Sequence, residues 1–157
     1  MRHFTPENFR NCTIGLLLGR ASSVKDRILD THLVPEGVTA AQFKVLLIME
    51  QFGVDRPAEL CRYLSLDSGS MTRMLDRLEQ KALIVRRPCA DDRRQVRVGL
   101  TGAGLELAGK LPVVGSDAMN ELVGVLEPDE LESLERILTK VLLAAGDTLT
   151  ALRVGAK

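Results

Sequence analysis

Side chains that can hydrogen-bond to nucleotides are gathered on one predicted helix, residues 68–81. Along this segment apolar residues recur at positions i, i+3, i+4 and i+7, which places them on a single inward face. That face consists of Met71, Met74, Leu75 and Leu78. The opposite face presents mainly hydroxyl, guanidinium and amide groups and comprises Gly69, Thr72, Arg73, Asp76, Arg77 and Gln80. Such groups bond to base edges and phosphates, and arginine can bond to two acceptors of guanine at once, so this face is a candidate for reading DNA.

The residues before this helix predict the turn of a helix-turn-helix. Residues 57–64 predict a short helix and residues 65–67 a turn, which is the spacing that this motif needs. Asp67 is expected to cap the second helix by accepting hydrogen bonds from its first free amides. Ser68 and Ser70 lie where the remaining amides and the helix dipole favour a phosphate group.

A predicted hairpin follows directly. Residues 83–87 and 95–100 have the residue pattern of strands, and residues 88–94 form the turn between them. The tip of this turn contains Asp91, Asp92, Arg93 and Arg94. A basic tip suits the narrow, electronegative minor groove. Asp92 is a candidate to orient an arginine, such as Arg77, through an ion pair.

The charge distribution favours specific over general binding to nucleic acid. The chain has 21 basic and 21 acidic residues, yet residues 68–97 carry an excess of positive charge. A protein that coats nucleic acid non-specifically relies on phosphate neutralisation, which a formal net charge of zero does not favour.

Two helices with apolar stripes flank this unit. Thr5-Pro6-Glu7 has a hydroxyl cap, a proline and an acid, and predicts the start of a long helix. Apolar residues then recur at three- and four-residue steps, at Ile14, Leu17, Ala21, Val24 and Ile28. A similar pattern follows the helix start at Pro128, at Leu131, Leu134, Leu138, Val141 and Ala145. We expect these stripes to form a two-fold dimer, because small DNA readers usually bind palindromic sites as dimers. Packing of both stripes inside one monomer is the alternative.

The remaining segments complete a single mainly α domain with a small β-hairpin wing, a winged helix-turn-helix. Thr39 predicts the cap of a helix that ends before Gly53, whereas Pro112 predicts a kink or break near residues 108–112. The DNA-binding lobe is expected to cover residues 38–101. The dimerisation helices are expected to cover residues 5–33 and 102–153.

Composition and residue spacing argue against other classes. No apolar run approaches the roughly 20 residues of a membrane helix, and the N-terminus lacks a secretory signal, so we expect a cytoplasmic protein. The cysteines, Cys12, Cys61 and Cys89, are widely spaced and odd in number, which is typical of free thiols. His3 and His32 have no neighbours with metal-ligand spacing. The sequence also lacks a catalytic nucleophile with a general base beside it. We therefore expect no enzyme, no metal and no cofactor.

The hairpin resembles a known family. Its residues Asp92-Arg93-Arg94-Gln95-Val96-Arg97-Val98-Gly99-Leu100-Thr101 match the DxR…LT wing motif of the MarR (multiple antibiotic resistance regulator) family, bacterial winged-helix repressors and activators. Similarity to the founding member extends over nearly the whole chain and includes residues 39–46, Leu75-Asp76-Arg77-Leu78 and Lys25-Asp26-Arg27. The resemblance implies a homodimer formed by the first and last helices, with the wing arginine, here Arg94, in the minor groove. It also implies a small phenolic or aromatic carboxylate ligand that binds between these helices and the DNA-binding lobe and releases the DNA.

The expected function is therefore sequence-specific DNA binding by a homodimeric repressor of a palindromic operator, relieved by a small phenolic or amphipathic ligand. The helix of residues 68–81 is expected to contact the bases. Arg86 or Arg97 is expected to contact phosphates. The predicted contacts are Ser68, Ser70, Thr72, Arg73, Arg77, Arg86, Arg94 and Arg97. Leu17 and Arg20 are candidates for the ligand, in an aliphatic pocket, because only 3% of residues are aromatic.

Two alternatives remain, one for how DNA binding is controlled and one for the class of macromolecule that is bound. Peroxide-sensing members of this family use a cysteine in the first helix, so Cys12 is a candidate for a peroxide- or thiol-responsive switch. Gln80 stands where the founding member has an oxidisable cysteine, so no thiol switch is implied there. A winged-helix module that binds protein in place of DNA is the other alternative, and Arg93 and Arg94 argue against it.

Overall fold

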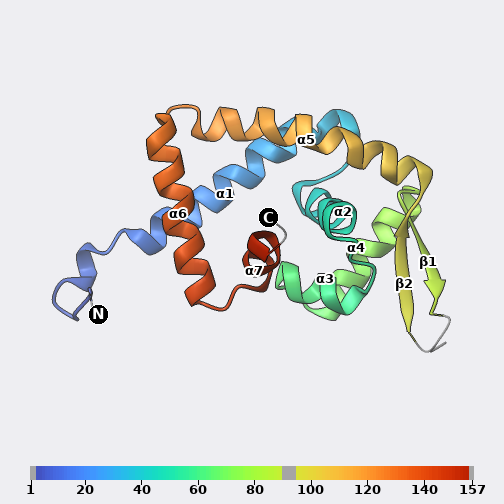
Figure 1. Cartoon of the computed structure of the whole chain (residues 1–157), viewed down its shortest axis with the longest axis horizontal. Helices are drawn as coiled ribbons and strands as arrows, with labels where there is room; N and C mark the ends of the chain where they lie inside the picture. The colour runs from blue at the N-terminus through green and yellow to red at the C-terminus, as the bar shows by residue number, and fades with distance from the viewer. Residues whose placement is uncertain (1–2, 90–94, 156–157) are drawn as a thin grey trace.

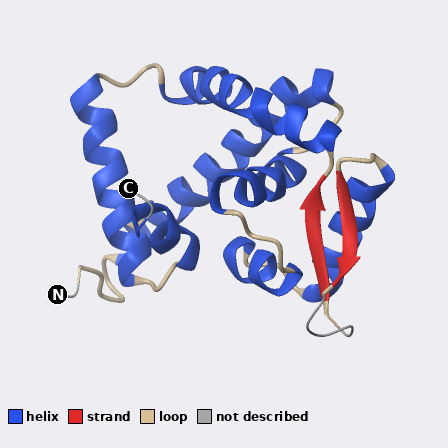
Figure 2. Cartoon of the chain, turned by 45° about the vertical axis from the view of Figure 1, so that its right-hand side comes forward, coloured by secondary structure: helices blue, strands red, loops and turns tan. Residues whose placement is uncertain are grey.

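The computed structural model describes residues 3–89 and 95–155, which form helices and one two-stranded hairpin that lies at one edge of the molecule (Figure 1, Figure 2). The helices are α1 (Ile14–Leu33), α2 (Ala40–Phe52), α3 (Pro57–Leu64), α4 (Ser68–Gln80), α5 (Gly102–Val123), α6 (Pro128–Ala144) and α7 (Thr148–Gly155). Two 3₁₀ turns, η1 (Phe9–Asn11) and η2 (Val34–Glu36), flank α1, and the strands are β1 (Ile84–Pro88) and β2 (Val96–Leu100). In Figure 1, α5 runs along the top, with the helix-turn-helix and hairpin at the right and α6 at the left.

The ends of α2 and α4 follow from their capping residues. Thr39 and Gln42 form a capping box at the start of α2, and Gly53 ends this helix in a left-handed conformation. Asp67 caps α4 by accepting a hydrogen bond from the Ser70 amide at 2.9 Å. The predicted bounds of α2 and α3, and the predicted caps of α2 and α4, are confirmed.

The hairpin is antiparallel, and the start of α5 packs closely against it. The register pairs Ile84 with Leu100 and Pro88 with Val96. Thr101 caps α5 by accepting a hydrogen bond from the Gly104 amide, while its own amide donates to Leu83 O at 3.1 Å. A Cβ at Gly104 would collide with that same Leu83 carbonyl, so the close approach of α5 to the hairpin requires glycine here.

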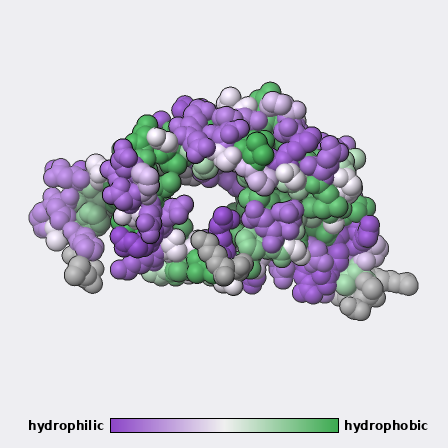
Figure 3. Space-filling view, turned by 45° about the horizontal axis from the view of Figure 1, so that its top comes forward, coloured by the Kyte–Doolittle hydropathy of each residue, from purple (hydrophilic) through white to green (hydrophobic). Residues whose placement is uncertain are grey.

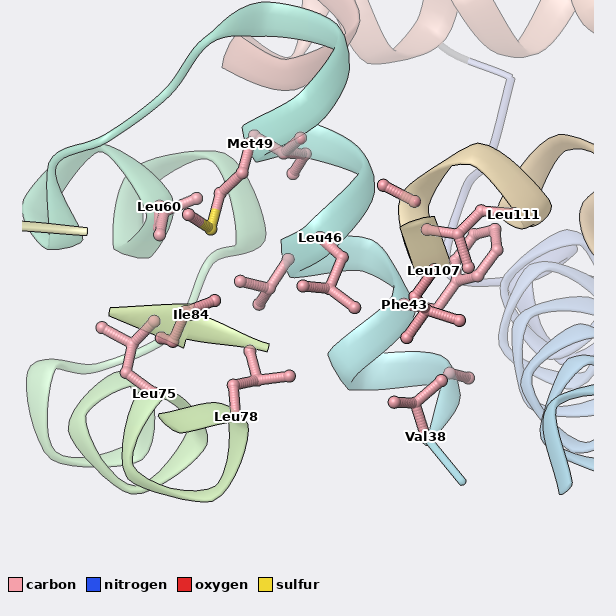
Figure 4. Packing of buried hydrophobic residues seen from close by; sticks show 14 of the residues in the cluster. Val38, Phe43, Leu46, Met49, Leu60, Leu75, Leu78, Ile84, Leu107 and Leu111 are labelled. Atoms are coloured by element: carbon pink, nitrogen blue, oxygen red, sulfur yellow. The ribbon is translucent and has the colours of Figure 1, made fainter. Parts of the chain in front are cut away.

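One hydrophobic core holds the helix-turn-helix, the hairpin and α5 together. Figure 4 shows side chains of α2, α3, α4 and β1 meeting at its centre, with α5 closing one side. The most deeply buried side chains are Leu33, Val45, Leu46, Leu60, Met71, Leu75, Leu78, Ile84 and Leu111. The inward face of α4 is thus part of the main core, which fixes the direction of its outward face.

The predicted helix start at Thr5 is wrong. Residues 6–8 form a turn and η1 a short 3₁₀ segment, and α1 begins only at Ile14. Every described residue from 3 to 11 is exposed. A short helix without a packed face is marginal in water, so local capping signals are not enough to extend it.

The break predicted near Pro112 is also wrong, because α5 is continuous from Gly102 to Val123. Pro112 is exposed, whereas Ala108, Leu111 and Ala118 are buried on the packed face. Burial of this face offsets the single backbone hydrogen bond that proline removes.

Several helices have exposed apolar residues. Figure 3 shows hydrophobic patches among hydrophilic ones and an opening at the centre of this view. On α1 these residues are Ile14, Leu16, Leu17 and Leu18, and on α6 they are Leu134, Ile137, Val141, Leu142 and Leu143. Helix α6 packs chiefly against α7. Among the described residues, no helix combines the length and hydropathy needed to cross a membrane.

Candidate nucleic-acid interface

The polar face of α4 points away from the core. Ser68, Thr72, Arg73 and Arg77 are exposed, and Ser70 is half-buried. On the other side Met71, Leu75 and Leu78 are buried, and Met74 packs against the core. The predicted division of this helix into an inward apolar face and an outward polar face is confirmed.

A chain of hydrogen bonds positions Arg73. Its Nη2 donates to Ser70 Oγ at 3.1 Å, and that hydroxyl donates to Asp67 Oδ2 at 2.6 Å. The hydrogen bond from the Ser70 side chain, followed by those from backbone amides, lowers the pKa of Asp67 below its usual value. The charged Asp67 carboxylate therefore holds the Ser70 hydroxyl in the orientation that accepts from Arg73.

Thr72 and Arg77 offer different groups on the same face. The Thr72 hydroxyl donates to Ser68 O at 2.8 Å, so its oxygen lone pairs and methyl group remain for a partner. Within the described residues, the exposed Arg77 guanidinium has no hydrogen bond or ion pair. Such a group keeps its donors for an incoming acceptor.

The two strand arginines are both paired with carboxylates. Arg86 Nη1 contacts Asp76 Oδ1 at 2.6 Å and Glu79 Oε2 at 3.1 Å. Arg97 Nη1 contacts both oxygens of Asp55, at 2.6 and 2.7 Å. The hydrogen bond to Asp55, assisted by Cys89, raises the pKa of Arg97. Phosphate contacts by these two arginines stay predictions.

Other predicted residues lie elsewhere or outside the described residues. The described residues do not include Asp91, Asp92, Arg93 and Arg94. The predicted minor-groove contact of Arg94 and the predicted ion pair of Asp92 therefore lie outside the described residues. Cys12 is half-buried and follows η1, and a switch at this thiol stays a prediction.

A cavity of about 440 Å³ lies between the long helices and the lobe that contains α4. Its lining includes Phe43 and Leu47 of α2, Leu111 of α5, and the cations Lys25, Lys44 and Arg153. The predicted ligand residues Leu17 and Arg20 are exposed on α1 and do not line it. Sequence reasoning missed these three cations, because they come from three helices whose separations along the chain have no periodic relation.

Asp26 links two of these cations. Lys25 Nζ and Lys44 Nζ lie 3.0 and 2.9 Å from Asp26 Oδ1. Burial alone would raise the pKa of Asp26, but the hydrogen bonds from Lys44 and Lys25 outweigh it, so the pKa lies below its usual value. Within the part of the chain that the structure describes, the Arg153 side chain makes one long hydrogen bond, 3.5 Å from its Nη1 to Gln51 Oε1.

Comparisons with known proteins agree with this architecture. A family model for the MarR family matches residues 38–96. The multiple antibiotic resistance protein MarR of Escherichia coli (strain K12) is 42% identical over 130 residues, which cover 82% of this chain and 90% of the relative. The crystal structure of a MarR mutant from E. coli in complex with operator DNA is 39% identical, with a TM-score of 0.78, and the match covers 88% of this chain and 99% of that one.

A more distant solved structure is also similar to this chain. It is BpsR of Bordetella bronchiseptica, whose structure concerns the regulation of DNA binding by 6-hydroxynicotinic acid. It is 25% identical, with a TM-score of 0.76, and the match covers 83% of this chain and 98% of that one. Together with the winged helix-turn-helix, the identity to E. coli MarR over most of both sequences establishes that this chain belongs to the MarR family of transcriptional regulators, which are not enzymes.

Proposed function

We propose that the chain is a homodimeric repressor that binds a palindromic operator and is released from it by a small amphipathic anion. The observation that carries the DNA-binding proposal is the outward face of α4, with two exposed arginines, Arg73 and Arg77, on a helix fixed to the core by its other face. The E. coli relative solved with operator DNA supports it.

In this proposal α4 reads bases in the major groove. Arg73 and Arg77 are the guanine-binding candidates, while Ser68, Ser70 and Thr72 contact bases or phosphates near the start of the helix. The proposed contact of Arg94 with the minor groove rests on the wing motif alone. A repressor acts where the chromosome lies, which supports the expected cytoplasmic location.

The exposed apolar residues of α1 and α6 support the homodimer. Ile14 and Leu17 of α1 and Ile137 and Val141 of α6 are each at least half exposed in one protomer. Large apolar side chains exposed on two helices favour an interface, and a two-fold axis would present two copies of α4 to two half-sites.

The cavity between the lobes supports the proposal of a small ligand. Its lining combines apolar side chains, among them Leu29, Phe43 and Leu111, with the cations Lys25, Lys44 and Arg153. An apolar body with one carboxylate matches this combination, because a few polar groups in an apolar pocket set the orientation of a ligand. The regulation of the related BpsR by 6-hydroxynicotinic acid is consistent with this class.

Fluorescence anisotropy tests DNA binding directly. The protein is titrated onto a duplex from its own upstream intergenic region and onto a scrambled duplex, over a series of salt concentrations. We expect a preference for the native duplex of about a thousandfold or more, with a steep salt dependence from phosphate contacts. If no preference is found, a duplex selected by the protein from a random pool is used, and failure to select any sequence would contradict the proposal.

The ligand proposal predicts an effect of Arg153→Gln. Benzoate and octanoate are titrated into the complex of the protein with its selected duplex, and the concentration for half-release is measured. Loss of one charged hydrogen bond should raise that concentration about tenfold or more, with DNA affinity without ligand measured for each variant as the reference. Arg20→Gln is the matched control, since Arg20 does not line the cavity. A larger effect at Arg20 would place the ligand on α1.

A further inference from the structure

A group of four residues joins the hairpin to α4 and is here named the Arg86 cluster. Its members are Thr72, Asp76, Glu79 and Arg86. Arg86 Nη1 donates to Asp76 Oδ1 at 2.6 Å and to Glu79 Oε2 at 3.1 Å, and Nη2 donates to Thr72 O at 3.3 Å. The backbone amide of Arg86 donates to Glu79 Oε1 at 3.2 Å. One strand residue is thus bonded to almost two turns of α4.

We propose that Arg86 is a positioning residue that fixes the wing relative to α4, in place of the phosphate contact expected from its sequence position. This inference rests on the proposed DNA-binding function. The guanidinium has two carboxylate partners and one carbonyl partner, and only 28% of the side chain is exposed. A phosphate would have to displace these partners, because the planar fork of arginine directs its donors in fixed directions.

The cluster also has an electrostatic role on the DNA-facing side of α4. Asp76 lies between Arg73 and Arg77 in sequence, and its side chain is 45% exposed. An unpaired carboxylate there would repel the phosphate backbone. Its ion pair with Arg86 neutralises this charge, while Arg73 and Arg77 keep theirs for DNA.

The neighbouring Arg87 provides a matched comparison. It is exposed on β1 and pairs with Arg97 through the strand register, and among the described residues its side chain makes no hydrogen bond or ion pair. Replacing Arg87 therefore removes the same charge from the same strand without disturbing the Arg86 cluster. A difference between the two alanine variants then reports on the cluster and not on net charge.

The test measures the ratio of affinities for operator and scrambled duplexes, together with the salt dependence of each. The variants are Arg86→Ala, Glu79→Ala, the double variant and Arg87→Ala, bound to the duplex that the wild-type protein selects. Selection by the wild type tests DNA binding itself, so its failure is distinguishable from failure of this inference.

A positioning role predicts that Arg86→Ala lowers the affinity ratio about tenfold, in addition to any equal weakening of both duplexes by the unpaired Asp76 carboxylate. Glu79→Ala should lower the ratio in the same direction, and the double variant should be no worse than Arg86→Ala, because both remove one coupled unit. Arg87→Ala should keep the ratio within about twofold of the wild type.

A phosphate contact predicts the opposite pattern and would overturn the inference. Arg86→Ala would then weaken both duplexes equally and reduce the salt slope by about 0.9, and Glu79→Ala would leave the ratio unchanged. Melting temperatures at one protomer concentration check that each variant is folded. If Arg86→Ala does not fold, Arg86→Lys replaces it, since lysine keeps the charge but loses the fork. A wild-type ratio in Arg86→Lys would contradict positioning.

Discussion

Replacing Arg73 and Arg77 together with alanine is expected to lower the affinity for the selected operator duplex by about 30-fold or more. Each arginine that bonds to two guanine acceptors contributes about 1–3 kcal/mol of discrimination. Both side chains are exposed on the outward face of α4, and Arg73 is already oriented by Ser70. The measurement is anisotropy on operator and scrambled duplexes at several salt concentrations.

The matched control for this double variant removes two exposed arginines from another part of the chain. Arg10 on η1 and Arg27 on α1 are both exposed, so their joint replacement changes the net charge by the same amount. We expect the control to retain operator preference, whereas the α4 variant should bind both duplexes with similar, weak affinity. Equal losses in the two double variants would mean that general charge, and not α4, determines binding.

Of the substitutions proposed here, Leu46→Ala is expected to lower the free energy of unfolding the most. Leu46 is completely buried at the centre of the core, where α2 meets α4 and the hairpin (Figure 4). Truncating a buried leucine costs about 2–5 kcal/mol, because transfer energy is lost and a cavity remains. For a chain of this size the melting temperature should fall by roughly 4 to 20 °C, measured by thermal unfolding at one fixed protomer concentration.

Leu105→Ala is the corresponding control, because Leu105 is 57% exposed on α5. Its replacement removes the same atoms without opening a closed cavity, so the melting temperature should change by no more than about 2 °C. A similar fall in both variants would indicate that Leu46 is not enclosed as described.

The helix-turn-helix could be predicted in detail because its determinants are local. The spacing of Met71, Leu75 and Leu78 defines the inward face of α4, and Thr39 and Asp67 supply caps within three residues of the amides that they bind. Such signals act over one or two turns and are visible in the sequence. The outward face of α4 follows from the same periodicity.

Features that depend on distant contacts could not be predicted. The signal at Thr5 was locally valid but had no packing partner, and Pro112 was tolerated because buried neighbours hold α5 together. The partners of Arg86 and Arg97 lie 7 to 42 residues away along the chain. Periodicity cannot show such pairs, since loops and strand register determine which residues meet.

Because α5 is continuous, a rotation at one end of this helix is transmitted to its other end. Its 22 residues span about 33 Å, with the tightly packed Gly104 at one end and the junction with α6 near the other. A tilt of about 10° at the far end would move the wing end by roughly 6 Å, which exceeds the rise of one base pair. A small change in the cavity that Leu111 and Pro112 line would then be amplified into a mismatch between α4 and its half-site.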